Sequence, residues 1–357
     1  MRTFRRMRWV GLASALGLLG AVTTSLWQPA LANACGVFAR KLAPEERPTL
    51  SREKVIIVHD AESGVEHFVR EVVFDKAADP LGFVVPTPTR PTVHAVKKTP
   101  FTALRSAFPF RPVPRGIGAR GRGYGSGSGA MLGGKGVQVL DVEQVGSFKA
   151  FVLAATDESA LASWLSENAF DSPPEAATWL KHYVDLGFYY VALRYDPPKR
   201  KRDEARAQLD AETLRITFEA PLPYYPYLEP RAPTLERNDP RLLEVWYVGA
   251  EPMVPVAVHS TEGDASWVRP WRAGERYPDA RDKLLGATKA QLSNLLPEGP
   301  LQLQTFQDQK RRRDGFGDVV LVPETTRALS AERRKALATF VSLLDPTLSP
   351  PAKEVEQ

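Results

Sequence analysis

The sequence predicts an α+β fold, with a mainly antiparallel sheet or sheets and about four amphipathic helices. Runs of β-branched and aromatic residues recur along most of the chain, as expected for strands. Two segments with helical periodicity follow each other within residues 157–187, so a two-helix insertion separates two strands. Strands and helices do not otherwise alternate, which argues against a doubly wound parallel sheet.

The first 34 residues are typical of a secretory signal peptide. MRTFRRMR gives a cationic start, an apolar run follows at 9–27, and small residues around Ala32 and Ala34 suit a signal peptidase. We expect cleavage after Ala32 or Ala34. An uncleaved anchor is the alternative, because the apolar run approaches spanning length. No later run is long enough to cross a bilayer, so we expect no transmembrane segment in the mature chain.

The leader also explains the basic balance of the chain. The whole sequence has 47 Lys and Arg against 42 Asp and Glu. Four arginines leave with the leader and no acid leaves with them, so 43 basic residues remain against 42 acidic ones. A mature chain this close to neutrality gives no argument for nucleic acid as a partner.

Cys35 is the only cysteine, so no intrachain disulfide can form and stability must come from burial. It directly follows Ala34, which makes it a candidate for lipidation of a new N-terminus. Ala34 fits a bacterial lipoprotein signal, whereas Asn33 fits it poorly. The alternative is a plain exported protein with one free thiol near its N-terminus.

Residues 35–114 are expected to form a β-rich N-terminal part. The run at 54–74 predicts a β-hairpin with its turn at 61–64. A third strand is expected at 81–85. It leads into PTPTRPTV, whose prolines should stop ladder pairing and favour an extended exit. A short helix at 101–108 closes this part.

The segment 115–136 is glycine-rich, and we interpret it as a loop or linker because it has little apolar material to bury. Two phosphate-loop patterns occur in it, at 116–121 and 129–135. The first follows no strand, and the second lacks the Ser or Thr that binds magnesium. We therefore predict no nucleotide binding and no cofactor.

Residues 137–345 form the larger α+β part, either as a domain of its own or in one domain with 35–114. Strands are expected at 137–145 and 148–154. The helix that follows is capped by Asp157 or Thr156 and has a buried stripe formed by Leu161, Trp164 and Leu165. A capping box at 172–175 starts the next helix, Gly187 ends it, and a strand follows at 188–195.

The rest of the chain continues the mixture of strands and helices. We expect strands at 214–220, 301–306 and 318–322, a hairpin at 242–248 and 254–259, a helix within 279–296, and a last helix that starts at Ser330 with Leu337, Phe340, Val341 and Leu344 on one face. Residues 346–357 are expected to be a disordered tail.

No catalytic or metal site is predicted. Asp141 and Glu143 fall on one face of a strand, a spacing compatible with paired acid and base groups, but no apolar pocket around them would raise one pKa. His59 and His67 flank one hairpin turn and can approach each other, yet they lack a third ligand. No serine stands at a strand-to-helix elbow.

Two kinds of surface are candidates for binding. Tyr224, Tyr225 and Tyr227 stand among prolines, where they can stack on sugar rings or receive a peptide; the alternative is aromatic packing against the prolines. The basic clusters at 199–202 and 310–313 are either solvated loops or contacts to anionic envelope polymers or lipid head groups.

A set of motifs spans most of the mature chain. They are ACG at 34–36, FVVPTP at 83–88, VGSFKAFVLAATDESALASWLSENAF at 145–170, YVDLGFYYVALRY at 183–195, LRITFEAPLPYYPY at 214–227 and LLEVWYVGAEP at 242–252. In these motifs the chain resembles the bacterial exported proteins grouped as domain of unknown function 2330. Members often carry a second cysteine soon after ACG, whereas residues 37–41 contain none. The family has no assigned activity, so the resemblance implies location and architecture.

We therefore expect an exported protein, periplasmic, envelope-associated or extracellular, that binds or scaffolds an unidentified envelope component without catalysis. The alternatives are an envelope hydrolase whose site is assembled from distant residues, and an N-terminally acylated lipoprotein.

Overall fold

The computed structural model describes residues 36–39, 50–74, 81–110, 136–170, 176–195, 213–230, 242–257, 270–309, 317–325 and 330–344. The α+β class is confirmed, because the helices α1 to α5 pack on sheets whose strand pairs are antiparallel with one exception. The predicted signal peptide, Cys35, most of the glycine-rich segment, both basic clusters and the residues after 344 lie outside these residues.

A seven-stranded sheet forms the centre of the molecule, in the order β13-β14-β11-β2-β3-β9-β5. Its strands are β2 (Leu50–Asp60), β3 (Val65–Phe74), β5 (Thr92–Ala95), β9 (Leu214–Glu219), β11 (Leu242–Gly249), β13 (Arg272–Tyr277) and β14 (Gln302–Asp308). β2 and β3 form the hairpin that the sequence predicts, and Gly64 adopts the positive φ that its turn requires. β2 and β11 run parallel, which is the exception to antiparallel pairing.

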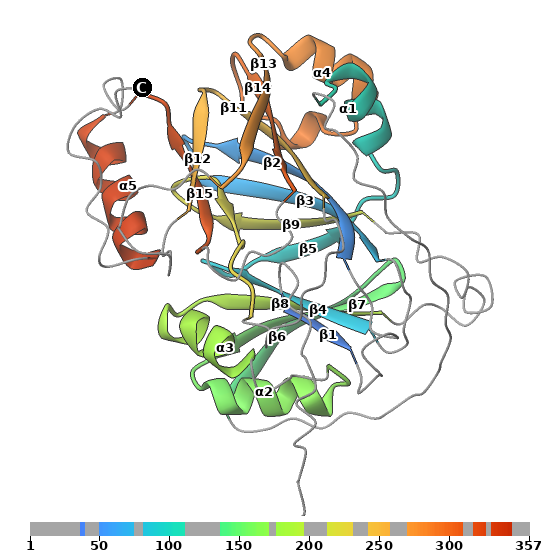
Figure 1. The fold of residues 1–357 in the computed structure, drawn as a ribbon, viewed down its shortest axis with the longest axis vertical. Helices are drawn as coiled ribbons and strands as arrows, with labels where there is room; N and C mark the ends of the chain where they lie inside the picture. The colour runs from blue at the N-terminus through green and yellow to red at the C-terminus, as the bar shows by residue number, and fades with distance from the viewer. Residues whose placement is uncertain are drawn as a thin grey trace, which may run out of the picture.

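A five-stranded antiparallel sheet packs beside it, in the order β1-β4-β8-β7-β6. Its strands are β1 (Gly36–Ala39), β4 (Leu81–Thr87), β6 (Val137–Val145), β7 (Phe148–Ala155) and β8 (Tyr189–Tyr195). The predicted insertion is confirmed as α2 (Glu158–Glu167) and α3 (Ala176–Asp185), which lie together on the outer face of this sheet (Figure 1). The Asp157 side chain, and not that of Thr156, caps α2 by accepting from Ala160 N.

Both faces of the seven-stranded sheet are buried, and they belong to two different cores. Val55 and Ile57 face the five-stranded sheet, while Ile56 and Val58 face the helices α1 (Phe101–Ala107) and α4 (Arg281–Thr288) and a short 3-10 turn at Ser293–Leu295. This explains why β2 carries a continuous apolar run at 55–58 rather than alternating apolar and polar residues there. The layers are therefore α2 and α3, the five-stranded sheet, the seven-stranded sheet, and α1 with α4 (Figure 1).

A buried ion pair lies between the two large sheets. Arg70 Nε is 2.8 Å from Glu53 Oε1, and both side chains are almost fully buried. The Arg70 guanidinium also lies 5.1 Å from the ring centre of Phe83, on β4 of the other sheet. The charge thus gains a carboxylate on its own sheet and an aromatic face on the opposite one, which offsets part of its desolvation.

A three-stranded sheet and α5 lie at the side of these layers (Figure 1). The sheet order is β10-β15-β12, with β10 at Tyr224–Tyr225, β12 at Met253–Ala257 and β15 at Val319–Pro323. α5 (Ala331–Leu344) begins after Ser330, whose hydroxyl accepts from Arg333 N, and it buries the predicted face. The side chains of Leu337, Phe340, Val341 and Leu344 join the main core.

Two expectations about the strands are wrong. The segments 242–248 and 254–259 do not pair as a hairpin, because β11 belongs to the seven-stranded sheet and β12 to the three-stranded one. The prolines of PTPTRPTV do not stop pairing at Val85, since β4 continues to Thr87 and β5 resumes at Thr92 on the other sheet.

The two parts of the chain, before and after the glycine-rich segment, share both large sheets.

Candidate functional site

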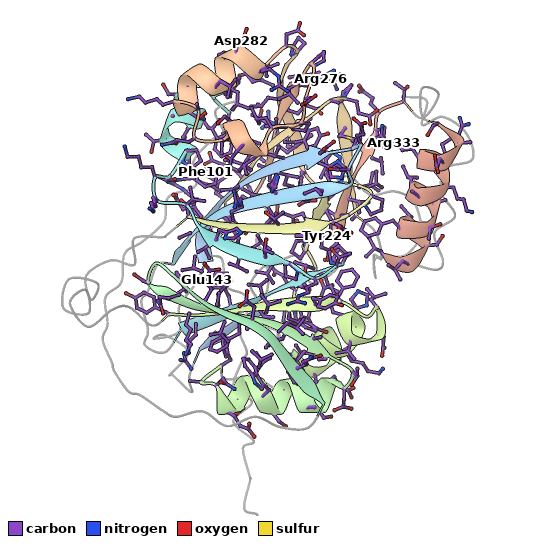
Figure 2. All side chains as sticks on the ribbon, turned by 180° about the vertical axis from the view of Figure 1, so that it is seen from behind. Phe101, Glu143, Tyr224, Arg276, Asp282 and Arg333 are labelled. Atoms are coloured by element: carbon purple, nitrogen blue, oxygen red, sulfur yellow. The ribbon has the colours of Figure 1, made fainter. Side chains whose placement is uncertain are left out.

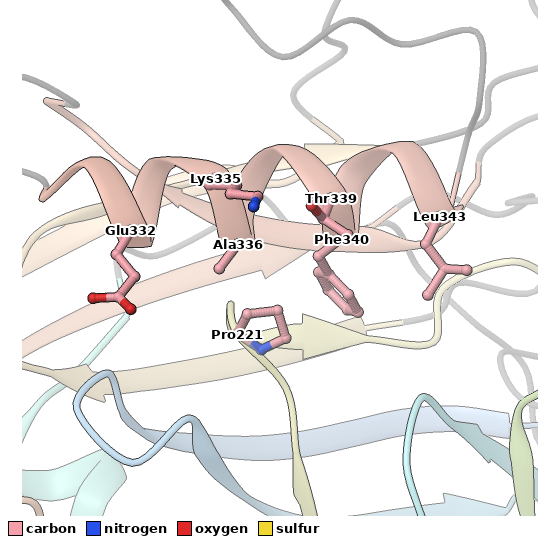
Figure 3. Close-up of a pocket in the computed structure, with 7 residues that line it drawn as sticks. All are labelled: Pro221, Glu332, Lys335, Ala336, Thr339, Phe340 and Leu343. Atoms are coloured by element: carbon pink, nitrogen blue, oxygen red, sulfur yellow. The ribbon is translucent and has the colours of Figure 1, made fainter.

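An open groove of about 430 Å³ runs along one face of α5 (Figure 3). The helix contributes residues that recur every three or four positions, and Pro221 contributes the opposite wall. The lining consists of Pro221, Glu332, Lys335, Ala336, Thr339, Phe340 and Leu343. Residues at this spacing share one face of a helix, so the groove follows the helix axis.

Most of the groove is apolar. The Phe340 ring is nearly buried at its base, and Leu343 at one end is 43% exposed, an unusual value for a leucine side chain among the described residues. The charged groups, Glu332 and Lys335, are exposed and stand at the opposite end, as Figure 3 shows. Such a surface can hold an apolar ligand, and it brings no buried acid, base or nucleophile to one point.

Two buried titratable side chains lie next to the Pro221 wall. His59 on β2 and Glu66 on β3 are direct cross-strand partners, and each is at most 1% exposed. His59 Nε2 is 2.9 Å from Ala220 O, and Tyr224 N donates to Glu66 Oε2 at 2.7 Å. The hairpin therefore holds the chain on both sides of Pro221.

Burial shifts both groups toward their neutral forms. It lowers the pKa of His59 to about 4; the bond to Ala220 opposes that shift, and the nearby Arg333 adds to it. Burial also raises the pKa of Glu66 well above its usual range, against the smaller effect of the bond from Tyr224. Neither group lines the groove, so their perturbed pKa values do not make a catalytic pair there.

The first turn of α5 is fixed near the same place. Arg333 forms an ion pair with Glu251, from the turn between β11 and β12. Figure 2 shows Arg333 and Tyr224 on the same side of the molecule. The groove wall at Pro221 and the start of α5 thus share one neighbourhood with His59 and Glu66.

The three candidate tyrosines are interior residues. Tyr224, Tyr225 and Tyr227 are each 0% exposed. The phenol of Tyr224 donates to Asp318 at 2.7 Å, and the phenol of Tyr227 donates to Asp308 at 2.8 Å. The expectation that these rings contact a ligand is corrected, since the rings are buried against other aromatic side chains, Phe188, Phe68 and Trp271.

The structure separates the two hairpin histidines. His67 pairs with Val58, on the face of the sheet opposite to His59, and its Nδ1 lies 2.9 Å from Thr217 Oγ1. Nowhere in the described ranges do three or more His, Cys, Asp or Glu side chains gather as a metal would require. The sequence hypothesis that His59 and His67 approach each other is therefore wrong.

Asp141 and Glu143 lie on the exposed edge strand β6, where Figure 2 marks Glu143. Asp141 Oδ1 accepts from Val142 N at 2.8 Å, so this carboxylate covers an edge amide of its own strand. A solvated strand face, which the sequence favours for this pair, agrees with this position.

Sequence reasoning missed the groove. It identified the buried face of α5 but not the stripe beside it. The available signal was the spacing of Ala336 and Leu343, which are seven residues apart and therefore share one face of the helix. Pro221 and the bonds of His59 and Glu66 come from segments more than 150 positions away from one another, and no local pattern reports such contacts.

Comparison with known protein families gives a match. A family model described as an uncharacterized protein conserved in bacteria, domain of unknown function 2330, matches residues 29–269. The chain belongs to this family. The match covers the strands of the five-stranded sheet, both inserted helices and the Pro221 segment, while α5 lies beyond it. The resemblance that the motifs imply is thus confirmed.

A search of curated proteins gave no significant match. Among solved structures, the crystal structure of baculovirus P35 aligns over 81% of this chain and 99% of its own, with 8% identity and a TM-score of 0.35. Similarity at this level carries no argument about fold or function.

Among the described residues, no helix combines the length and apolarity needed to span a bilayer.

Proposed function

We propose that this member of the family is an exported, non-catalytic binding or scaffolding module of the bacterial cell envelope. The groove on α5 is the observation that carries the proposal. It is open, mainly apolar and free of a converging acid, base or nucleophile, which suits the holding of a ligand better than its turnover.

The ligand that fits best is an extended, apolar segment of a polypeptide. The lining runs from Glu332 to Leu343, which is about 17 Å along a helix axis. An extended chain covers that length with roughly five residues. The opposite charges of Glu332 and Lys335 at one end can pair with polar groups that flank such a segment.

The leader supports export. Its cationic start, apolar run and small residues are those of a secretory signal peptide. Mass spectrometry of the mature N-terminus tests this part of the proposal. Cleavage after Ala32 or Ala34 supports it, diacylglycerol on Cys35 identifies a lipoprotein, and an intact leader on the cell-associated protein contradicts it.

Binding is tested with a displayed library of short peptides panned against the mature chain. Leu343→Asp should abolish selection of apolar sequences, because it places a charge at the apolar end of the groove. Ser342→Asp is the matched control, since it adds the same charge to an exposed position of the same helix that does not line the groove. Equal binding by the two variants would place the ligand elsewhere.

Catalysis is tested in parallel. The mature chain should show no turnover in a broad hydrolase screen. Turnover that an Asp141 or Glu143 substitution abolishes without unfolding the chain would replace this proposal with an envelope hydrolase.

A further inference from the structure

His59 and Glu66 hold the chain segment that forms one wall of the groove. His59 Nε2 bonds to Ala220 O on one side of Pro221, and Glu66 Oε2 receives Tyr224 N on the other. The two side chains stand opposite each other on the β2–β3 hairpin. Two ties of the wall are therefore made by side chains that can change their protonation state. A third tie, from Ala220 N to Gly64 O at 2.7 Å, joins backbone groups and does not depend on protonation.

We propose that this pair is an acid-sensitive clamp: protonation of His59 places a buried charge behind the Pro221 wall, and the start of α5 moves away from that wall. The proposal rests on the groove being the binding site, and it adds that the site releases its ligand in acid.

The geometry shows why protonation is disruptive. A neutral His59 donates from Nε2 to Ala220 O, which leaves Nδ1 as the unprotonated ring nitrogen. Nδ1 is buried and has no hydrogen-bond partner. A second proton must go to Nδ1, where it creates a buried charge and a donor without an acceptor.

The surrounding charges decide which element moves. Arg333 on α5 repels a cationic His59, whereas Asp60 on the same hairpin attracts it. The Asp60 carboxylate is already engaged by Ser63 Oγ at 2.7 Å and Glu62 N at 2.9 Å. Repulsion therefore acts between the hairpin and the first turn of α5. Arg333 stands in that turn and is also paired with Glu251, from the β11–β12 turn.

The other neighbours keep the far end of the segment in place. Glu66 accepts from Tyr224 N in its neutral form, so acid does not remove that bond. Tyr247 on β11 also faces Glu66, and burial raises the pKa of its phenol, so it does not titrate in acid. Tyr224 itself stays bonded to Asp318. The Pro221 segment thus stays on the hairpin, and the release is confined to its contact with α5.

Hydrogen–deuterium exchange of the full mature chain tests the clamp without any ligand. Labelling from about pH 7.5 to about pH 4.5, with times scaled for the intrinsic exchange rate, should reveal an increase of up to about a hundredfold in the opening of α5. The reason is that pH 4.5 lies about two units below the usual pKa of a histidine, whereas His59 stays neutral in the closed chain down to about pH 4. β7 and β8 should keep their protection across the same range.

Three variants separate the clamp from general acid lability. His59→Gln retains an N–H donor but cannot be protonated, so α5 should lose its pH response. His67→Gln, on the opposite face of the hairpin, should retain the response. Glu66→Gln should retain it as well. A response that persists in His59→Gln, or an α5 whose protection is constant with pH, overturns the proposal.

A second measurement covers the case in which His59→Gln does not fold. The ring carbon signal of His59, followed by NMR in the unmodified chain, should titrate together with the loosening of α5. Titration of His59 without any change in α5 overturns the clamp. In either case peptide binding at neutral pH remains a separate result, so the clamp can fail while the proposed function stands.

Discussion

Tyr183 on α3 donates a 2.8 Å hydrogen bond to Asp318, just before β15. The two residues are 135 positions apart, and the bond joins the helical layer to the three-stranded sheet. Asp318 also receives the Tyr224 phenol and the backbone amides of Tyr227 and Leu228. A single buried carboxylate thus connects α3, β10, β15 and the chain that follows β10.

We expect Asp318→Ala to lower the free energy of unfolding by about 3–5 kcal/mol, because it leaves two buried phenols and two amides without their acceptor. Asp318→Asn should cost much less. It keeps one carbonyl oxygen for the Tyr183 and backbone bonds and presents an amide to the Tyr224 phenol, which can accept. Urea unfolding followed by fluorescence measures both; equal losses would show that charge, and not acceptor geometry, dominates this site.

Trp164 should behave as a core residue and not as a ligand platform. It is 3% exposed and stacks on Phe170 with ring centres 6.2 Å apart. Trp164→Ala is expected to cost about 3–5 kcal/mol in unfolding free energy. Ser163→Ala, at the exposed neighbouring position of α2, should change it by less than about 0.5 kcal/mol. A loss at Trp164 as small as that of the control would remove α2 from the core.

Two glycine substitutions should have opposite signs. A Cβ at Gly82 would lie 2.4 Å from two ring atoms of Phe170 and 3.2 Å from Leu193 O, so Gly82→Ala should destabilise by about 1–3 kcal/mol. Gly286 lies in α4 with open space at its Cβ position. Gly286→Ala should stabilise by about 0.5–1 kcal/mol through its helix propensity. Thermal unfolding of the two variants compares them, and a stabilising Gly82→Ala would mean that β4 and Phe170 are spaced more widely.

Glu66→Gln should become increasingly stabilising as the pH rises. The folded pKa of Glu66 lies well above its unfolded value of about 4.5. Its contribution to the free energy of unfolding is therefore fully present below about pH 4.5 and is lost as the pH rises toward the folded pKa. Glutamine does not titrate. The difference in unfolding free energy between the variant and the unmodified chain should therefore grow by up to about 1.4 kcal/mol per pH unit. Unfolding free energies at acid and neutral pH measure it. Glu62→Gln, the same substitution at an exposed position of the adjacent turn, is the matched control.

The sequence predicts the parts of this fold that local periodicity controls. The α2 stripe, the Gly187 stop and the β2–β3 hairpin are short-range patterns, and all three are confirmed. β13 was missed because RAGERY has no apolar alternation. It is placed by a bulge and by the close approach of Gly274 to Thr305, whose hydroxyl accepts from Glu275 N.

The candidate site was less predictable for the same physical reason. Tyrosines among prolines suggest a surface, yet Asp318 and Asp308 supply buried acceptors that let the phenols enter the core. Those acceptors come from strands far along the chain. The groove depends equally on a contact between Pro221 and α5, and no window of the sequence contains both.

The parallel pairing of β2 with β11 has a consequence for how the chain acquires its structure. Leu242 aligns with Arg52, 190 positions earlier, at the middle of the largest sheet. Until that late segment is synthesised, the early hairpin lacks its neighbour, and closing so long a loop precedes any gain from the contact. We expect slow folding, with the chain uncommitted until most of it exists. Such a delay keeps a polypeptide threadable through a secretion channel, which suits the export that we propose.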